Sequence, residues 1–132
     1  MNKVILITGA SSGIGKNTAL SLIKEGHVVY GAARRLEMMQ DIIQAGGHAI
    51  KMDILKERNI DEVVNQIVKE QNRIDVLINN AGYGLWGAVE TISIAEAKRQ
   101  FDVNIFGLAY LTKKIIPLMR KQKSGKIVNM SS

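Results

Sequence analysis

Three glycines and two serines are concentrated in one short segment near the start of the chain, directly after an apolar run. The segment reads Thr8-Gly9-Ala10-Ser11-Ser12-Gly13-Ile14-Gly15 and lies where a first buried strand should give way to a first helix. Glycines permit a tight turn with a bare backbone, and the free N–H groups and dipole of a helix N-terminus stabilise negative charge. Gly15 would let the helix pack close to the sheet. We therefore predict that Thr8, Gly9, Ser11, Ser12, Gly13, Ile14 and Gly15 bind the diphosphate of a dinucleotide, the alternative being a purely structural turn.

Two adjacent arginines follow the second apolar run. Arg34 and Arg35 come about 20 residues after the glycine segment, where an acidic residue would bind the ribose diol of NAD, and no acid is there. A guanidinium group keeps its charge and offers a planar fork to two phosphate oxygens, which suits the 2′-phosphate of NADP. The pair predicts that NADP(H) is favoured over NAD(H). The alternative is two solvated arginines at a helix start.

Polar side chains also follow the third and fourth apolar runs. Asp53 can accept a hydrogen bond from an adenine amino group, or it can cap the helix that begins near Lys56. Two adjacent amides, Asn79 and Asn80, are costly to bury without partners. They either tie neighbouring strand ends together or line a cofactor groove, and the two roles are compatible. The predicted cofactor site therefore also includes Asp53, Ile54, Asn80, Ala81 and Gly82.

Five short runs rich in Val and Ile alternate with stretches of helical periodicity. The apolar runs cover residues 4–7, 28–30, 49–52, 76–78 and 127–130, and the helical stretches cover residues 16–24, 36–44, 57–70 and 94–121. Continuous apolar strands joined by helices are typical of a parallel sheet that is buried on both faces. We predict one doubly wound α/β domain over residues 1–132. Gly26, the Gly46-Gly47 pair and Gly125 fall between helix and strand, where we expect left-handed residues to end the helices.

The composition is that of an ordinary globular protein and argues against several classes of function. Basic residues exceed acidic ones by six charges, but they are scattered and not interleaved with aromatics, so we predict no nucleic-acid partner. The chain has no cysteine and only two isolated histidines, so we predict no metal site. No apolar run approaches the ~20 residues of a membrane span. The N-terminus also lacks a secretory signal pattern, so we predict a cytoplasmic location and no membrane partner.

Four motifs in order resemble the short-chain dehydrogenase/reductase family. They are the glycine segment, Asn79-Asn80-Ala81-Gly82, Asn104 within Phe101-Asp102-Val103-Asn104, and Ile127-Val128-Asn129-Met130-Ser131-Ser132. The glycine spacing TGxxxGxG is that of the family's single-domain branch, and the resemblance spans the whole chain. It implies a Rossmann-like sheet with strand order 3-2-1-4-5, here ending after the fifth strand. It further implies NAD(P)(H)-dependent interconversion of a small-molecule alcohol and a carbonyl.

The catalytic residues that the resemblance implies are only partly present. Asn104 would hold the water of a proton relay, and Ser132, rather than Ser131, would bind the substrate oxygen. The family's Tyr-x-x-x-Lys should follow that serine, and the chain ends first. We interpret Tyr110 and Lys114 as an ordinary helix-surface pair. Because proton transfer needs a positioned acid, we predict an incomplete domain, the N-terminal cofactor-binding half of an oxidoreductase, that is inactive alone.

Two other readings of the sequence stay open: a non-catalytic dinucleotide-binding module, and an interaction protein that recruits a partner. The strand over residues 126–130 resembles an interior strand of the family and would here form an edge, whose unpaired backbone groups invite another chain. We predict a homo-oligomer, formed across that edge or through the helix over residues 105–121. In that helix, Leu108, Leu111, Ile115 and Leu118 are either contact residues or core residues.

Overall fold

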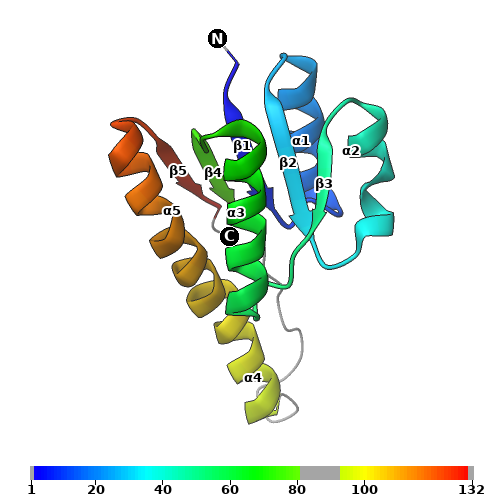
Figure 1. Ribbon diagram of the computed structural model, residues 1–132. Coiled ribbons are helices and arrows are strands. Elements are labelled where there is room, and N and C mark those ends of the chain that lie inside the picture. The colour runs from blue at the N-terminus through cyan, green and yellow to red at the C-terminus, as the bar shows by residue number, and fades with distance from the viewer. Residues whose placement is uncertain (1, 81–92, 131–132) are drawn as a thin grey trace.

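The structure describes residues 2–80 and 93–130, except for the side chains at positions 100, 101, 103 and 104. A parallel sheet lies at the centre of this part of the chain. In this computed structural model the described strands form one five-stranded sheet in the order β3-β2-β1-β4-β5 (Figure 1). The strands are β1 (Val4–Thr8), β2 (Val28–Ala33), β3 (His48–Lys51), β4 (Val76–Asn79) and β5 (Lys126–Asn129). All four pairings are parallel. The predicted fold class and strand order are confirmed.

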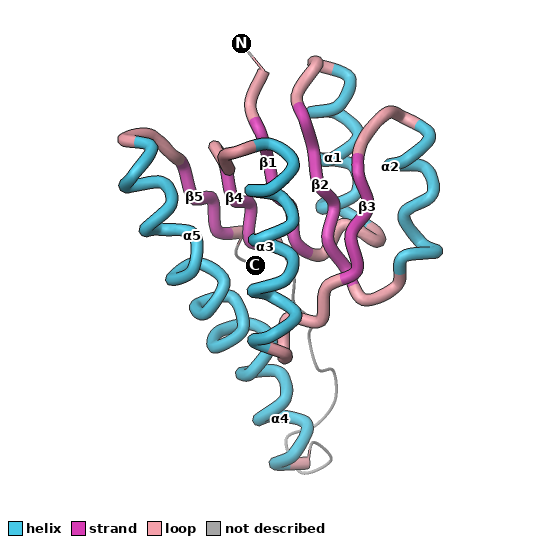
Figure 2. Tube along the Cα trace, viewed as in Figure 1, coloured by secondary structure: helices cyan, strands magenta, loops and turns pink. Residues whose placement is uncertain are grey.

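Helices cover both faces of this sheet. α1 and α2 lie on one face, and α3 and α5 lie on the other (Figure 1, Figure 2). The helical segments are α1 (Gly13–Lys24), a 3-10 turn η1 (Leu36–Met39), α2 (Gln40–Gln44), α3 (Glu57–Gln71), α4 (Ile94–Phe101), a π-helical segment η3 (Asp102–Gly107) and α5 (Leu108–Gln122). The helix predicted over residues 94–121 is therefore interrupted by a wider π turn. The helix predicted over residues 36–44 is divided into a 3-10 turn and a short α-helix.

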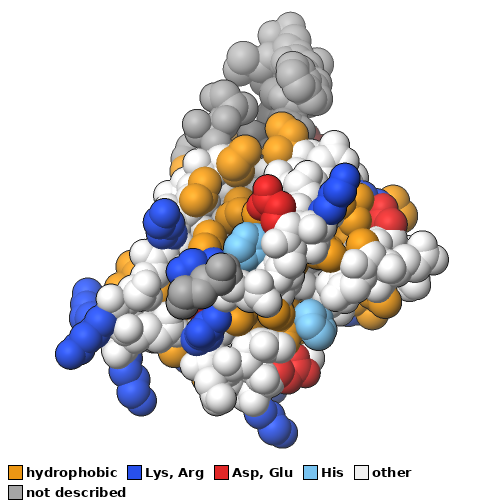
Figure 3. Space-filling model, turned by 90° about the horizontal axis from the view of Figure 1, so that it is seen from above, with side chains coloured by type: hydrophobic (Ala, Val, Ile, Leu, Met, Phe, Trp, Pro, Cys, Tyr) orange, Lys and Arg blue, Asp and Glu red, His pale blue; other side chains and the backbone are white. Residues whose placement is uncertain are grey.

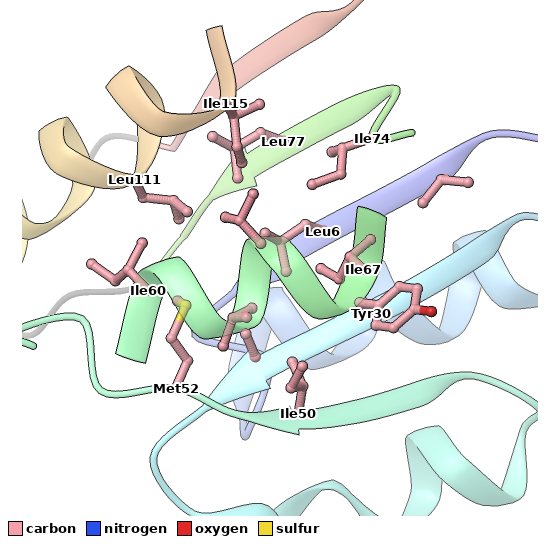
Figure 4. Packing of buried hydrophobic residues seen from close by; sticks show 14 of the residues in the cluster. Leu6, Tyr30, Ile50, Met52, Ile60, Ile67, Ile74, Leu77, Leu111 and Ile115 are labelled. Carbon is pink, nitrogen blue, oxygen red and sulfur yellow. The ribbon is translucent and has the colours of Figure 1, made fainter. Parts of the chain in front are cut away.

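Each face of the sheet has its own apolar core, and the larger one lies under α3 and α5 (Figure 4). α3 buries Ile60, Val63, Val64 and Ile67, whose spacing of three and four residues places them on one side of the helix. Fully burying such a side chain contributes roughly 1.5–3 kcal/mol. These side chains meet strand residues such as Leu6 and Leu77. The helical periodicity read from the sequence therefore has its physical origin in this contact.

The ends of the helices agree with the glycine pattern at two positions and differ at a third. Gly26 and Gly46 have φ angles of 93° and 99°, as expected for left-handed residues after helices. The prediction for Gly125 is wrong, because α5 ends on Lys123 with a φ of 59°. Gly125 is instead packed so closely against Met119 that a Cβ atom there would overlap this side chain.

One side of the helix α5 packs into the core. Leu111 and Ile115 are fully buried, and Leu108 and Leu118 pack against the same core from partly buried positions. The core alternative for these four residues is thus the one observed. β5, in contrast, lies at the edge of the described sheet, with Val128 41% exposed.

Figure 3 looks at the end of the molecule where the N-terminus lies, and Lys and Arg stand apart there with other side chains between them. This view shows no continuous basic stripe on that face. No helix within residues 2–80 and 93–130 is long and apolar enough to cross a membrane.

Candidate functional site

The predicted site residues follow four parallel strands, so the topology brings them to one edge of the sheet. The glycine segment follows β1, the arginine pair follows β2, Asp53 follows β3, and Asn79 and Asn80 lie at the end of β4. Because the described strands all run the same way, these ends share the carboxyl edge. β1 is flanked by β2 and β4, whose chain connections leave in opposite directions across the sheet. Such a switch point is where ligands of open α/β sheets bind.

The glycine segment forms a turn that leaves the start of α1 open. Gly9 and Gly13 have φ angles of 65° and 59°, a region that favours glycine. Ser12 precedes the helix in an extended conformation, its side chain makes no capping hydrogen bond, and the first turn holds no acidic residue. Ser12, Gly13 and Ile14 are exposed. The first N–H groups of α1 are therefore uncapped by side chains and accessible, with the positive end of the helix dipole behind them.

Gly15 is required by the close approach of α1 to the preceding turn. A Cβ atom at this position would overlap the carbonyl oxygen of Gly9 and the side-chain amide of Asn80. The packing role predicted for Gly15 is thus visible in the structure, and one of the two groups that it meets belongs to Asn80, the residue directly after β4.

Asn80 and Thr8 tie the glycine segment to β4. The backbone N–H of Asn80 donates to Thr8 Oγ1 over 2.9 Å, and the Asn80 side-chain amide donates to the carbonyl of Gly9 over 3.3 Å. The hydroxyl of the fully buried Thr8 reaches the carbonyl of Ile78 over 3.5 Å. Asn80 therefore positions the turn from the neighbouring strand.

Asn79 performs the other role considered for the asparagine pair, that of joining strand ends. Its Nδ2 donates to Asn129 Oδ1 over 2.8 Å and to Thr112 Oγ1 over 3.1 Å. The Thr112 hydroxyl in turn donates to the carbonyl of Leu108 over 2.8 Å. This buried amide links β4, β5 and α5. The network involves Thr112 and Asn129, which the sequence did not identify as partners because they are far along the chain.

Arg34 and Asp53 line a groove of about 800 Å³ between β3 and α3. Arg34 and Arg35 are both exposed. Asp53 Oδ1 accepts a hydrogen bond from the Leu55 N–H over 3.0 Å, and α3 begins after Lys56 without a side-chain cap. The helix-capping alternative for Asp53 is therefore wrong, because its carboxylate closes the turn before the helix.

The segment that carries Asn104 packs against the loop after β3. Asn104 lies in the π-helical segment, a wider turn that is frequent at functional sites, and its side chain is not described. A Cβ atom on Gly107 would lie 2.6 Å from the carbonyl oxygen of Ile54. This close contact brings the π turn to the buried Ile54. Ala81, Gly82 and Ser132 lie outside the described residues.

Tyr110 and Lys114 meet a shared partner on α3. The Tyr110 hydroxyl donates to Asp61 Oδ1 over 2.9 Å, and Lys114 Nζ lies 3.5 Å from the same oxygen. The hydrogen bond to Asp61 raises the pKa of Tyr110. A catalytic tyrosine base needs the opposite shift. The pair is therefore a link between helices rather than a replacement for a catalytic tyrosine and lysine.

Comparison with known proteins identifies a family and a common fold. Residues 3–132 match the family model described as short chain dehydrogenase. A 3-ketodihydrosphingosine reductase from Bacteroides thetaiotaomicron is 42% identical over 130 residues, which make up 98% of this chain and 47% of that protein.

Two solved structures show the same architecture. A short-chain dehydrogenase from Streptomyces avermitilis has a TM-score of 0.95 and 39% identity, and the match covers 100% of this chain and 50% of that one. A variant of actinorhodin polyketide ketoreductase, solved with NADPH, has a TM-score of 0.91 and 31% identity, and the match covers 99% of this chain and 53% of that one. The chain spans about half the length of these proteins.

Proposed function

Since the chain belongs to the short-chain dehydrogenase family, we propose that it forms the cofactor-binding part of an NADP(H)-dependent oxidoreductase that interconverts a small-molecule alcohol and a carbonyl. The observation that carries the proposal is the open N-terminus of α1, held against β4 by Asn80. A dinucleotide diphosphate matches its exposed N–H groups and positive potential. In this proposal residues 8, 9 and 11–15 bind the diphosphate, and residues 80–82 border it.

A preference for NADP(H) is the finer part of the proposal. Arg34 and Arg35 follow β2 at the place where the ribose of the adenosine half would lie, and they form no ion pair with another described residue. A 2′-phosphate would neutralise them. One structural relative was solved with NADPH, which is a property of that protein and agrees with our proposal.

The proposed catalytic roles concern Asn104 and Ser132. Bound NADPH would supply the hydride for a carbonyl carbon. Ser132 would donate a hydrogen bond to the carbonyl oxygen, and Asn104 would hold a water that delivers a proton. The acid itself would come from a Tyr-x-x-x-Lys placed after Ser132, a position that these 132 residues do not reach. We therefore propose that the 132-residue chain binds the cofactor and does not turn over alone.

Titration with NADPH and NADH tests the cofactor assignment. We expect NADPH to bind more tightly, and Arg34→Asp to weaken NADPH binding by at least about tenfold with little effect on NADH. Arg120→Asp, the same charge reversal in the last turn of α5, is the matched control. Equal affinity for both cofactors, or an unchanged NADPH affinity in Arg34→Asp, would contradict the NADP(H) preference.

An activity assay separates the enzyme from a binding module. We expect the 132-residue chain to bind NADPH without reducing carbonyl compounds, and a longer protein with a Tyr-x-x-x-Lys after Ser132 to reduce them. Cofactor binding without turnover in both would favour the non-catalytic module. The exposed edge strand β5 is the feature that favours an interaction role. Homo-oligomer formation and a cytoplasmic location stay predictions.

A further inference from the structure

Four basic side chains line the groove between β3 and α3, and the cofactor proposal uses only one of them. Arg34, Lys51, Lys56 and Arg58 line it together with the carboxylates of Asp53 and Glu62. All four cations are exposed, and none forms an ion pair or a side-chain hydrogen bond with another described residue. Cations outnumber carboxylates in the groove, and Asp53 already accepts the Leu55 N–H. The groove therefore has unused positive charge.

The position of Lys56 and Arg58 is unfavourable for an isolated helix. Lys56 occupies the N-cap position of α3, and Arg58 is the second residue of this helix. Positive charge at a helix N-terminus opposes the helix dipole and typically costs a few tenths of a kcal/mol per residue. Glu57 in the same turn supplies one favourable negative charge, and the two cations beside it still outnumber it. An anion in the groove would remove this conflict, because it would meet both cations and the helix N-terminus.

The start of α3 is held firmly at the carboxyl edge of the sheet. The Asp53 N–H donates to Asn59 Oδ1, and the Lys56 N–H donates to the carbonyl of Asp53 over 3.0 Å. These bonds connect the end of β3 to the first turn of the helix. Arg58 is thus carried on a fixed element, while Arg34 enters the same groove from the end of β2.

From this arrangement we infer that Arg58 is a second guanidinium for the 2′-phosphate of the cofactor, acting across the groove from Arg34. The inference rests on the proposed binding of NADP(H). Two guanidinium groups offer more donors than one, and a phosphate dianion has enough acceptor oxygens for both. Lys51 and Lys56 add positive potential at the same place. Arg58 is therefore a specificity-determining residue that distinguishes NADP(H) from NAD(H).

The test compares Arg58→Gln with Arg120→Gln, which removes the same group from the last turn of α5. Calorimetric titration is expected to show NADPH binding about tenfold weaker in Arg58→Gln, the size of a charge-assisted hydrogen bond, and NADH binding unchanged. Arg58→Lys should restore part of the affinity. Thermal unfolding of each variant checks that the fold is retained.

A fragment titration isolates the phosphate contact from the rest of the cofactor. In the ¹⁵N-labelled chain, adenosine 2′,5′-bisphosphate should shift the amide signals of Arg58 and Asn59, and adenosine 5′-phosphate should not. Loss of NADPH affinity in Arg34→Asp but not in Arg58→Gln would overturn the role of Arg58 and leave the proposed cofactor intact. Failure of the wild-type chain to bind either cofactor or either fragment would overturn both.

Discussion

Gly15 faces the carbonyl of Gly9 and the side chain of Asn80, which leaves no room for a Cβ atom. The same contacts hold the first turn of α1 against the end of β4. Ser12, in contrast, stands at the start of the helix without a capping bond. Within this short segment, therefore, packing requires a glycine at position 15, whereas the Ser12 side chain makes no capping bond and can contact a ligand.

Gly15→Ala should destabilise the protein and weaken NADPH binding. The added methyl group must displace backbone at Gly9 or the amide of Asn80, and such overpacking costs about 1–3 kcal/mol. Urea unfolding and NADPH titration measure the two effects. Ser12→Ala is the control and should change the free energy of unfolding by less than about 0.5 kcal/mol, because no side-chain cap is lost. An equal free energy of unfolding for Gly15→Ala and wild type would contradict this prediction, because it would show that the turn moves to make room for the methyl group.

At the scale of elements, a polar cluster joins β2 to the end of α3. The Tyr30 hydroxyl donates to Glu70 Oε1 over 2.6 Å and accepts from Gln71 Nε2 over 3.2 Å. The Tyr30 ring is stacked on His48 of β3, with ring centroids 4.4 Å apart. The hydrogen bond from Tyr30 lowers the pKa of Glu70. This cluster fixes the end of α3 over the sheet.

The contribution of this cluster should depend on pH. Because the pKa of Glu70 is lowered in the folded chain, its stabilising effect is present above its ordinary pKa of 4.5 and is lost as pH falls through the lowered value. Tyr30→Phe keeps the ring and removes the hydroxyl. Its urea midpoint should lie below that of wild type at pH 7, and the difference should narrow below pH 4.5.

The control for this pH effect is Glu70→Gln. In the Glu70→Gln background, the difference in urea midpoint between chains with Tyr and with Phe at position 30 should stay constant through the acid range, because the titrating carboxylate is gone. A narrowing that persists in Glu70→Gln would assign the pH dependence to another group.

At the scale of the whole molecule, the described sheet ends in two edge strands, β3 and β5. In the edge strand β5, Val128 is 41% exposed. Edge strands with apolar exposure promote association between chains, and an added lysine opposes it. The chain also spans about half the length of the relatives reported above. We therefore predict association across β5, which can be measured directly.

Sedimentation velocity should show self-association of the wild-type chain, and Val128→Lys should shift it toward monomer at the same concentration. Ile43→Lys is the matched control, because Ile43 is 46% exposed and lies on α2, away from β5. Both variants should keep the circular dichroism spectrum of the wild type. Association that persists in Val128→Lys but disappears in Ile43→Lys would place the interface elsewhere.

The order of the elements and the position of the candidate site could be predicted from the sequence alone. Alternating apolar and helical periodicity predicted five strands and the helices between them, and the glycine segment predicted the turn before α1. These features are local, since they depend on side-chain spacing within an element and on the backbone freedom of glycine.

Only the tertiary structure decided which groups become partners. Lys123 rather than Gly125 takes the left-handed conformation after α5, and Gly125 serves instead as a small residue beside Met119. Tyr110 and Lys114 share Asp61, and Asn79 meets Asn129, across sequence separations that spacing does not encode. Arg34 and Arg58 likewise line one groove because β2, β3 and α3 pack side by side. Such contacts depend on how elements are placed against each other, and packing sets that placement.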